Sequence, residues 1–108
     1  MKNLVDILNA NNIILKKIEK IDLANLGSRQ KIDLFSGVDE AKYYIAIFLV
    51  RNKSRFVKSS AIKIMELEKR LEIYVNHVYK NRLLVITSPL CSKAKSLLKE
   101  NKWKIIEV

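Results

Sequence analysis

Glycine, proline and cysteine are scarce in this sequence. It contains two glycines, one proline and one cysteine among 108 residues. So few chain breakers favour regular secondary structure joined by short connections over long irregular loops. The single cysteine, Cys91, cannot form an internal disulfide. A disulfide-stapled secreted fold is therefore excluded, and a reducing cytoplasmic location is expected.

Long apolar runs and a secretory signal are also missing. The longest apolar run covers residues 43–50, whereas a bilayer-spanning helix needs about 20 apolar residues. The N-terminal stretch "MKNLVDILNANN" is amphipathic and has neither the apolar core nor the cleavage site of a signal peptide. We therefore expect no membrane partner.

The charge is strongly one-sided. The chain has 21 Lys and Arg residues against 11 Asp and Glu, which gives a formal net charge of +10 at pH 7. Such an excess favours a polyanionic partner, above all nucleic acid. Because 49% of the residues are hydrophobic, disorder is not expected, and the length fits one domain over residues 1–108.

The apolar pattern predicts an alternation of helices and strands. Apolar residues recur at three- and four-residue steps over residues 61–79 and, more briefly, over 2–10, which is typical of amphipathic helices. A further helix is predicted to start at Pro89. Strands are predicted over residues 13–18, 31–36, 43–50, 82–88 and 103–108, with a loop over 22–30 and a turn over 37–42.

The continuous apolar run at residues 43–50 predicts a central strand that is covered on both faces. The short turn before it predicts an antiparallel hairpin with the strand over 31–36. The helical connections after it predict parallel neighbours with right-handed crossovers. The predicted fold class is α/β, a single-domain mixed sheet with helices on both faces and the order α-β-β-β-α-β-α-β.

Three stretches carry a family resemblance: "KIDLF" at 31–35, "YYIAIFLVRNKSR" at 43–55 and "RLLVITSPLCSKAKSLLKENKWKII" at 82–106. Their order resembles the restriction-endonuclease-like (PD-(D/E)XK) superfamily, in particular small archaeal RecB-like and Holliday-junction-resolvase-like proteins. The resemblance covers nearly the whole chain. It implies a divalent-metal site in which an Asp on the second strand acts with a Glu-x-Lys on the third.

Only the first of these site residues has a match. Asp33 corresponds to the first carboxylate, but fourteen and sixteen residues later, where the resemblance places Glu and Lys, the sequence has Ile47 and Leu49. Since a divalent metal needs about two convergent carboxylates, the resemblance implies a degenerate nuclease that holds no metal and no cofactor. Asp33 is then either a relic of the site or an ordinary solvated carboxylate. A Glu-Ala-Lys does occur at Glu40 to Lys42, where the composition is typical of a polar turn.

A basic cluster follows the central strand. Arg51, Lys53, Arg55 and Lys58 lie between that strand and the predicted long helix. Backbone N–H groups at a helix start and cationic side chains both suit phosphate, so we predict a nucleic-acid surface here. Phe56 lies among these residues and is interpreted as a core residue rather than a base-stacking one. The cluster would be extended, if the first loop folds over the same end of the sheet, by Lys16, Lys17, Lys20, Arg29 and Lys31.

Three functional hypotheses follow. The first is a non-catalytic nucleic-acid-binding or accessory subunit on a degenerate nuclease fold, acting in DNA replication, recombination or repair or in RNA processing. The second is an active nuclease that uses Mg²⁺ and Asp33 with unorthodox partners such as Asp39, Glu40, Lys42 or Lys53. The third is a protein–protein module of a larger nucleoprotein complex. DNA is favoured over RNA as the ligand, and a protein partner or a homodimer is expected.

Overall fold

The computed structural model describes residues 4–27, 32–51 and 54–108. Within these residues the chain forms three α-helices, one short 3-10 helix and five strands. In chain order they are α1 (Leu4–Ala10), β1 (Leu15–Ile21), the 3-10 helix η1 (Leu23–Leu26), β2 (Asp33–Asp39), β3 (Tyr44–Val50), α2 (Lys58–Val75), β4 (Asn81–Ile86), α3 (Ser92–Glu100) and β5 (Lys104–Glu107).

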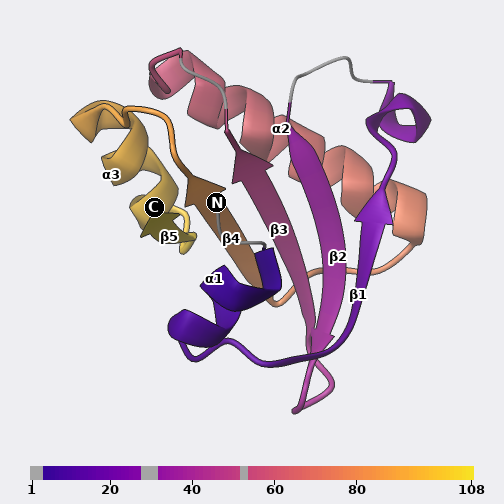
Figure 1. Cartoon of the computed structure of the whole chain (residues 1–108). Coiled ribbons are helices and arrows are strands. Elements are labelled where there is room, and N and C mark those ends of the chain that lie inside the picture. Colours follow the sequence, from indigo (N-terminus) through magenta and orange to yellow (C-terminus); the bar gives the residue numbers. More distant parts are fainter. Residues whose placement is uncertain (1–3, 28–31, 52–53) are drawn as a thin grey trace.

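The strands form one mixed sheet in the order β1-β2-β3-β4-β5 (Figure 1). The pairs β1–β2 and β2–β3 are antiparallel, and the pairs β3–β4 and β4–β5 are parallel. The antiparallel hairpin, the parallel neighbours and the central place of the apolar strand are therefore confirmed, as is the α-β-β-β-α-β-α-β order.

Helices cover both faces of this sheet, with α2 and α3 on one side and α1 on the other (Figure 1). Successive residues of a strand point to opposite faces, so β3 contributes to two separate cores. Towards α2 and α3 it sends Ala46, Phe48 and Val50, and towards α1 it sends Ile45, Ile47 and Leu49. This double burial is the reason that β3 has no charged residue.

Several boundaries differ from the predictions. β1 lies at residues 15–21 rather than 13–18, the predicted loop over 22–30 contains η1, and β2 continues to Asp39 through part of the predicted turn. α2 starts at Lys58 and ends at Val75, because Asn76 takes a left-handed conformation with φ of 59°. α3 starts at Ser92 and not at Pro89. No helix in the described part of the chain is long and apolar enough to cross a membrane.

Candidate nucleic-acid interface

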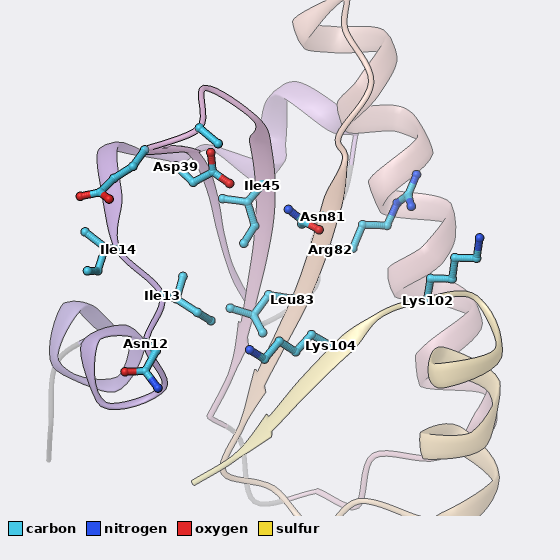
Figure 2. Close-up of a pocket in the computed structure, with 12 residues that line it drawn as sticks. Asn12, Ile13, Ile14, Asp39, Ile45, Asn81, Arg82, Leu83, Lys102 and Lys104 are labelled. Carbon is cyan, nitrogen blue, oxygen red and sulfur yellow. The ribbon is translucent and has the colours of Figure 1, made fainter.

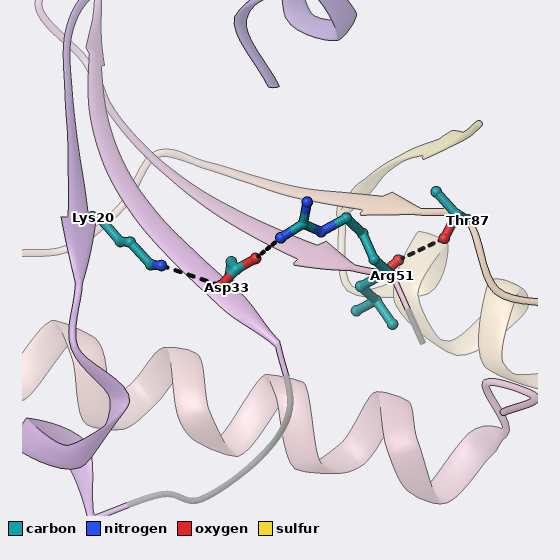
Figure 3. Close-up of polar contacts among 5 residues, drawn as sticks. Lys20, Asp33, Arg51 and Thr87 are labelled. Carbon is teal, nitrogen blue, oxygen red and sulfur yellow. Dashed lines mark hydrogen bonds and ion pairs between the residues drawn. The ribbon is translucent and has the colours of Figure 1, made fainter. Parts of the chain in front are cut away.

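Asp33 and Arg51 meet at one end of the sheet. Asp33 is the first residue of β2, and Arg51 directly follows β3. Because the two strands are antiparallel, with Asp33 opposite Leu49, the start of one lies beside the end of the other. Arg51 Nη2 lies 2.7 Å from Asp33 Oδ2, and Lys20 Nζ of β1 lies 3.4 Å from Oδ1 (Figure 3). Each carboxylate oxygen therefore has its own cationic neighbour.

The backbone before Arg51 is anchored to β4. The backbone N–H of Thr87 donates to the carbonyl oxygen of Val50 at 3.0 Å. The Thr87 hydroxyl donates to the same oxygen at 3.4 Å (Figure 3). Val50 is itself buried. The basic segment thus leaves the sheet from a fixed point, and the head of Arg51 is held separately by Asp33.

Phe56 joins the basic segment to the chain before α3. It forms an isolated parallel bridge with Leu90, in which the Phe56 N–H donates to the Pro89 carbonyl at 2.7 Å and the Cys91 N–H donates to the Phe56 carbonyl at 3.0 Å. The Phe56 side chain is only 5% exposed and belongs to the core under α2 and α3. The interpretation of Phe56 as a core residue is confirmed, and the bridge explains why α3 starts after Cys91.

The bridge brings the N-terminal ends of α2 and α3 side by side. A shallow hollow of about 420 Å³ between them is lined by cations from both segments, namely Arg55, Lys58 and Lys93. All three side chains are exposed. The residue before α2 is Val57, which has no polar side chain to cap the first turn of that helix. Sequence reasoning missed Lys93, because nothing in the spacing of residues 55 and 93 indicates the bridge.

Three solved structures are similar to this chain over nearly all of its length. EndoMS in its apo form matches with a TM-score of 0.59 and 19% identity over 97% of this chain. The chain has a restriction-endonuclease-like fold. A repair endonuclease from Pyrococcus abyssi matches at 0.54 with 21% identity over 94%, and an EndoMS–dsDNA complex at 0.53 with 17% identity over 94%. The chain spans 44%, 43% and 41% of these three chains, less than half of each. No protein-family model and no curated protein sequence matches it.

The residues beside Asp33 do not fit the divalent metal that the restriction-endonuclease-like fold implies. Ile47 is 0% exposed and Leu49 is 7% exposed, and both pack with Ile7 and Leu8 of α1. In residues 4–27, 32–51 and 54–108, no group of three His, Cys, Asp or Glu side chains comes together as a metal site. Asp33 is thus a single carboxylate that is already paired with two cations, whereas Mg²⁺ or Ca²⁺ demands more oxygen ligands.

Glu40 and Lys42 lie at the far end of β2 from Asp33. They belong to the hairpin turn before β3, where Asp39 Oδ1 accepts the N–H of Tyr43 at 2.9 Å and Lys42 has a φ of 68°. The seven residues of β2 separate this turn from Asp33 by about 20 Å. The structure therefore does not bring Asp33 together with Asp39, Glu40 or Lys42. Lys53 lies outside the described residues.

The other predicted basic residues divide between the two ends of the sheet. Lys17 is opposite Val38, so Lys16 and Lys17 lie near the hairpin turn rather than near Arg51. Lys20, three residues further along β1, reaches Asp33. Arg29 and Lys31 lie outside the described residues. We call Lys20, Arg51, Arg55, Lys58 and Lys93 the basic end of the molecule.

A cavity of about 410 Å³ lies at the opposite end, beside α1 (Figure 2). Its lining carries both signs of charge, with two carboxylates and three cations, namely Asp39, Glu40, Arg82, Lys102 and Lys104. Ile45 and Leu83 form an apolar floor. A pocket with this mixed charge suits a polyanion less well than the basic end does.

Exposed apolar and aromatic side chains gather near the C-terminal end of α2. The rings of Tyr44 and His77 stack with centroids 3.8 Å apart, and Lys80 Nζ lies 3.6 Å from the centre of the Tyr43 ring. On the last turn of α2 and just after it, Ile73 is 80% exposed and Val78 is 72% exposed. This aromatic end is separated from the basic end by the length of β3. His77 is thus an aromatic neighbour of Tyr44.

A buried polar cluster supports β4 from the α2 side. Arg82 Nε lies 2.8 Å from Glu68 Oε1, and Arg82 Nη2 lies 3.6 Å from Glu72 Oε2. Burial raises the pKa of Glu68, and the Arg82 guanidinium opposes that rise. Burial also raises the pKa of Tyr79, whose hydroxyl donates to Ser36 Oγ at 2.7 Å. The cluster is internal and distant from the basic end, so it holds the sheet and α2 together.

Proposed function

We propose that this chain is a non-catalytic nucleic-acid-binding subunit built on a restriction-endonuclease-like fold. It acts in DNA replication, recombination or repair, or in RNA processing. The observation that carries the proposal is the position of Asp33. A nuclease of this fold needs a metal there, and this chain instead pairs its single carboxylate with Arg51 and Lys20.

The basic end supplies the binding surface in this proposal. Its five cations come from β1, from the segment after β3 and from the starts of α2 and α3. Cations on rigid elements bind backbone phosphates with little dependence on sequence. One of the similar structures is an EndoMS–dsDNA complex, which favours DNA over RNA as the ligand. The active-nuclease hypothesis lacks support, because no group of three His, Cys, Asp or Glu side chains that could hold a metal forms among the described residues.

A cleavage assay tests the non-catalytic part of the proposal. Plasmid DNA, single-stranded DNA and a structured RNA are incubated with the protein in Mg²⁺ or Mn²⁺, beside the Asp33→Ala variant. We expect no cutting above the level of that variant. Metal-dependent cutting by the wild type that disappears in Asp33→Ala would contradict the proposal and restore the nuclease hypothesis.

A second candidate function, a protein–protein module, is favoured by the aromatic end. Ile73 and Val78 expose large apolar surfaces to solvent, and such surfaces mark partner sites when they gather in one place. If this end binds a partner or a second copy, Ile73→Ser with Val78→Ser should abolish that association and leave nucleic-acid affinity unchanged. Light scattering gives the oligomeric state, and purification from the source cell gives the partner. Unchanged association in both measurements would exclude this surface.

A further inference from the structure

Arg51 lies against the carboxylate of Asp33, the one acid of this chain that the family resemblance assigns to a nuclease metal site. Its Nη2 atom is 2.7 Å from Oδ2, which is the distance of a strong charge-assisted hydrogen bond. The other carboxylate oxygen faces Lys20 at 3.4 Å. The inward side of this position is closed by Leu49 and Ile47, which are buried under α1. The positive charge next to Asp33 is therefore built into the chain.

The guanidinium keeps donors for a ligand. Within the described residues, Nη2 is the only guanidinium nitrogen of Arg51 that donates a hydrogen bond to another side chain. Since a guanidinium carries five N–H donors in a fixed plane, most of its donors stay available. The Arg51 side chain is 49% exposed, and the backbone before it is fixed by the Thr87–Val50 hydrogen bonds. The free edge of the guanidinium thus faces solvent at the basic end. Its orientation is fixed by Asp33 at the guanidinium and by the Thr87–Val50 hydrogen bonds at the backbone.

We infer that Arg51 takes the place of the divalent metal: its guanidinium neutralises Asp33 and presents its remaining N–H donors to a backbone phosphate. This inference rests on the proposed nucleic-acid-binding function. A metal in a nucleotide site bridges one or two carboxylates and the phosphates of the ligand. The guanidinium makes the same bridge between Asp33 and a phosphate, but it cannot dissociate. Binding to nucleic acid is therefore independent of divalent metal.

The test is a metal-rescue experiment on binding. The affinity for a fluorescent 20-base-pair DNA duplex is measured at constant ionic strength, once with EDTA and once with Mn²⁺. The proteins are wild type, Arg51→Ala, the double variant Arg51→Ala with Asp33→Asn, and Arg55→Ala. Arg55 is the matched control, because it belongs to the same basic end and forms no ion pair with a carboxylate of the described residues.

Each variant has a distinct expected result. In EDTA, the loss of one phosphate contact weakens Arg51→Ala and Arg55→Ala by about fivefold near 0.15 M salt. Mn²⁺ leaves the wild type and Arg55→Ala unchanged. It restores binding of Arg51→Ala by about threefold or more, because a metal can then bridge the phosphate and the Asp33 oxygen that Arg51 has left. The double variant shows no rescue, since it lacks the carboxylate. Arg51→Gln replaces Arg51→Ala if melting shows that the alanine variant is unfolded.

The contrary results are separable. A wild type whose affinity rises with Mn²⁺ would overturn the inference, and so would an Arg51 variant that Mn²⁺ does not rescue or rescues without Asp33. In each of these cases the proposed nucleic-acid binding would stand. A wild type that binds no DNA even at low salt would overturn both the inference and the proposed function.

Discussion

Placing a glutamate at position 47, where the family resemblance expects one, should remove a large part of the free energy of unfolding. Ile47 is fully buried between β2, β4 and α1, so Ile47→Glu puts a carboxyl group into an apolar core. At pH 7 the group either stays ionised without a partner or takes up a proton. Protonation against a pKa of about 4.3 in the unfolded chain costs roughly 3.7 kcal/mol, and the lost isoleucine packing adds about 1 kcal/mol.

This cost is a large part of the free energy of unfolding of a small domain, which is about 5–15 kcal/mol. At about 4 °C per kcal/mol for a chain of this size, the variant should melt roughly 15–20 °C below wild type at pH 7. The raised pKa of the buried carboxyl means that the folded state binds more protons than the unfolded state. Stability therefore falls as pH rises above about 4.3, and the deficit should shrink as the pH is lowered to that value.

Ile47→Gln is the matched control, because it has the same shape as the glutamate and cannot ionise. Thermal melts of both variants at about pH 4 and about pH 7 separate two effects on the melting temperature, that of a buried charge and that of a buried polar group. The two variants should have the same melting temperature at the lower pH, and Ile47→Glu should melt below Ile47→Gln at the higher pH. If Ile47→Glu melts within about a degree of wild type at both pH values, position 47 faces an open cleft, and the account of a closed metal position is wrong.

Two further predictions concern the cores. Arg82→Met should cost about 3 kcal/mol at neutral pH, because it leaves the buried Glu68 charge without its partner, whereas Glu68→Gln should cost under about 1.5 kcal/mol. The Arg82→Met deficit should shrink on acidification, since burial already raises the pKa of Glu68; a deficit that does not change with pH would exclude this mechanism. Phe56→Ala should cost about 3–5 kcal/mol in denaturant unfolding while the folded fraction keeps its affinity for DNA, and a selective loss of affinity would indicate base stacking instead.

The central strand and the element order could be predicted because their signals are local. An uninterrupted apolar run as short as 43–50, rich in aromatic and β-branched residues, favours a strand with two covered faces, and the structure buries residues 45–50 in two cores. The absence of an acid at positions 47 and 49 is likewise plain in the sequence. These features required no knowledge of which segments meet in space.

Features that depend on distant contacts could not be predicted in this way. Gly37 was assigned to a turn, but it lies inside β2, where an added Cβ would be 2.9 Å from Leu15 Cδ1 of the neighbouring strand. Pro89 was assigned to a helix start, but the bridge between Phe56 and Leu90 keeps the chain extended there. The same bridge adds Lys93 to the basic end. Each of these differences between prediction and structure is caused by a contact between segments that are distant in the sequence, and composition does not indicate such contacts.

The salt dependence of DNA binding tests the central claim most directly. Each phosphate contact contributes a slope of about −0.9 to log K against log salt on duplex DNA. Arg51→Ala with Arg55→Ala should therefore reduce the slope by about one to two, while Lys16→Ala with Lys17→Ala, which removes the same charge at the other end of the sheet, should leave it unchanged. Equal slopes for the two double variants would contradict an interface at the basic end.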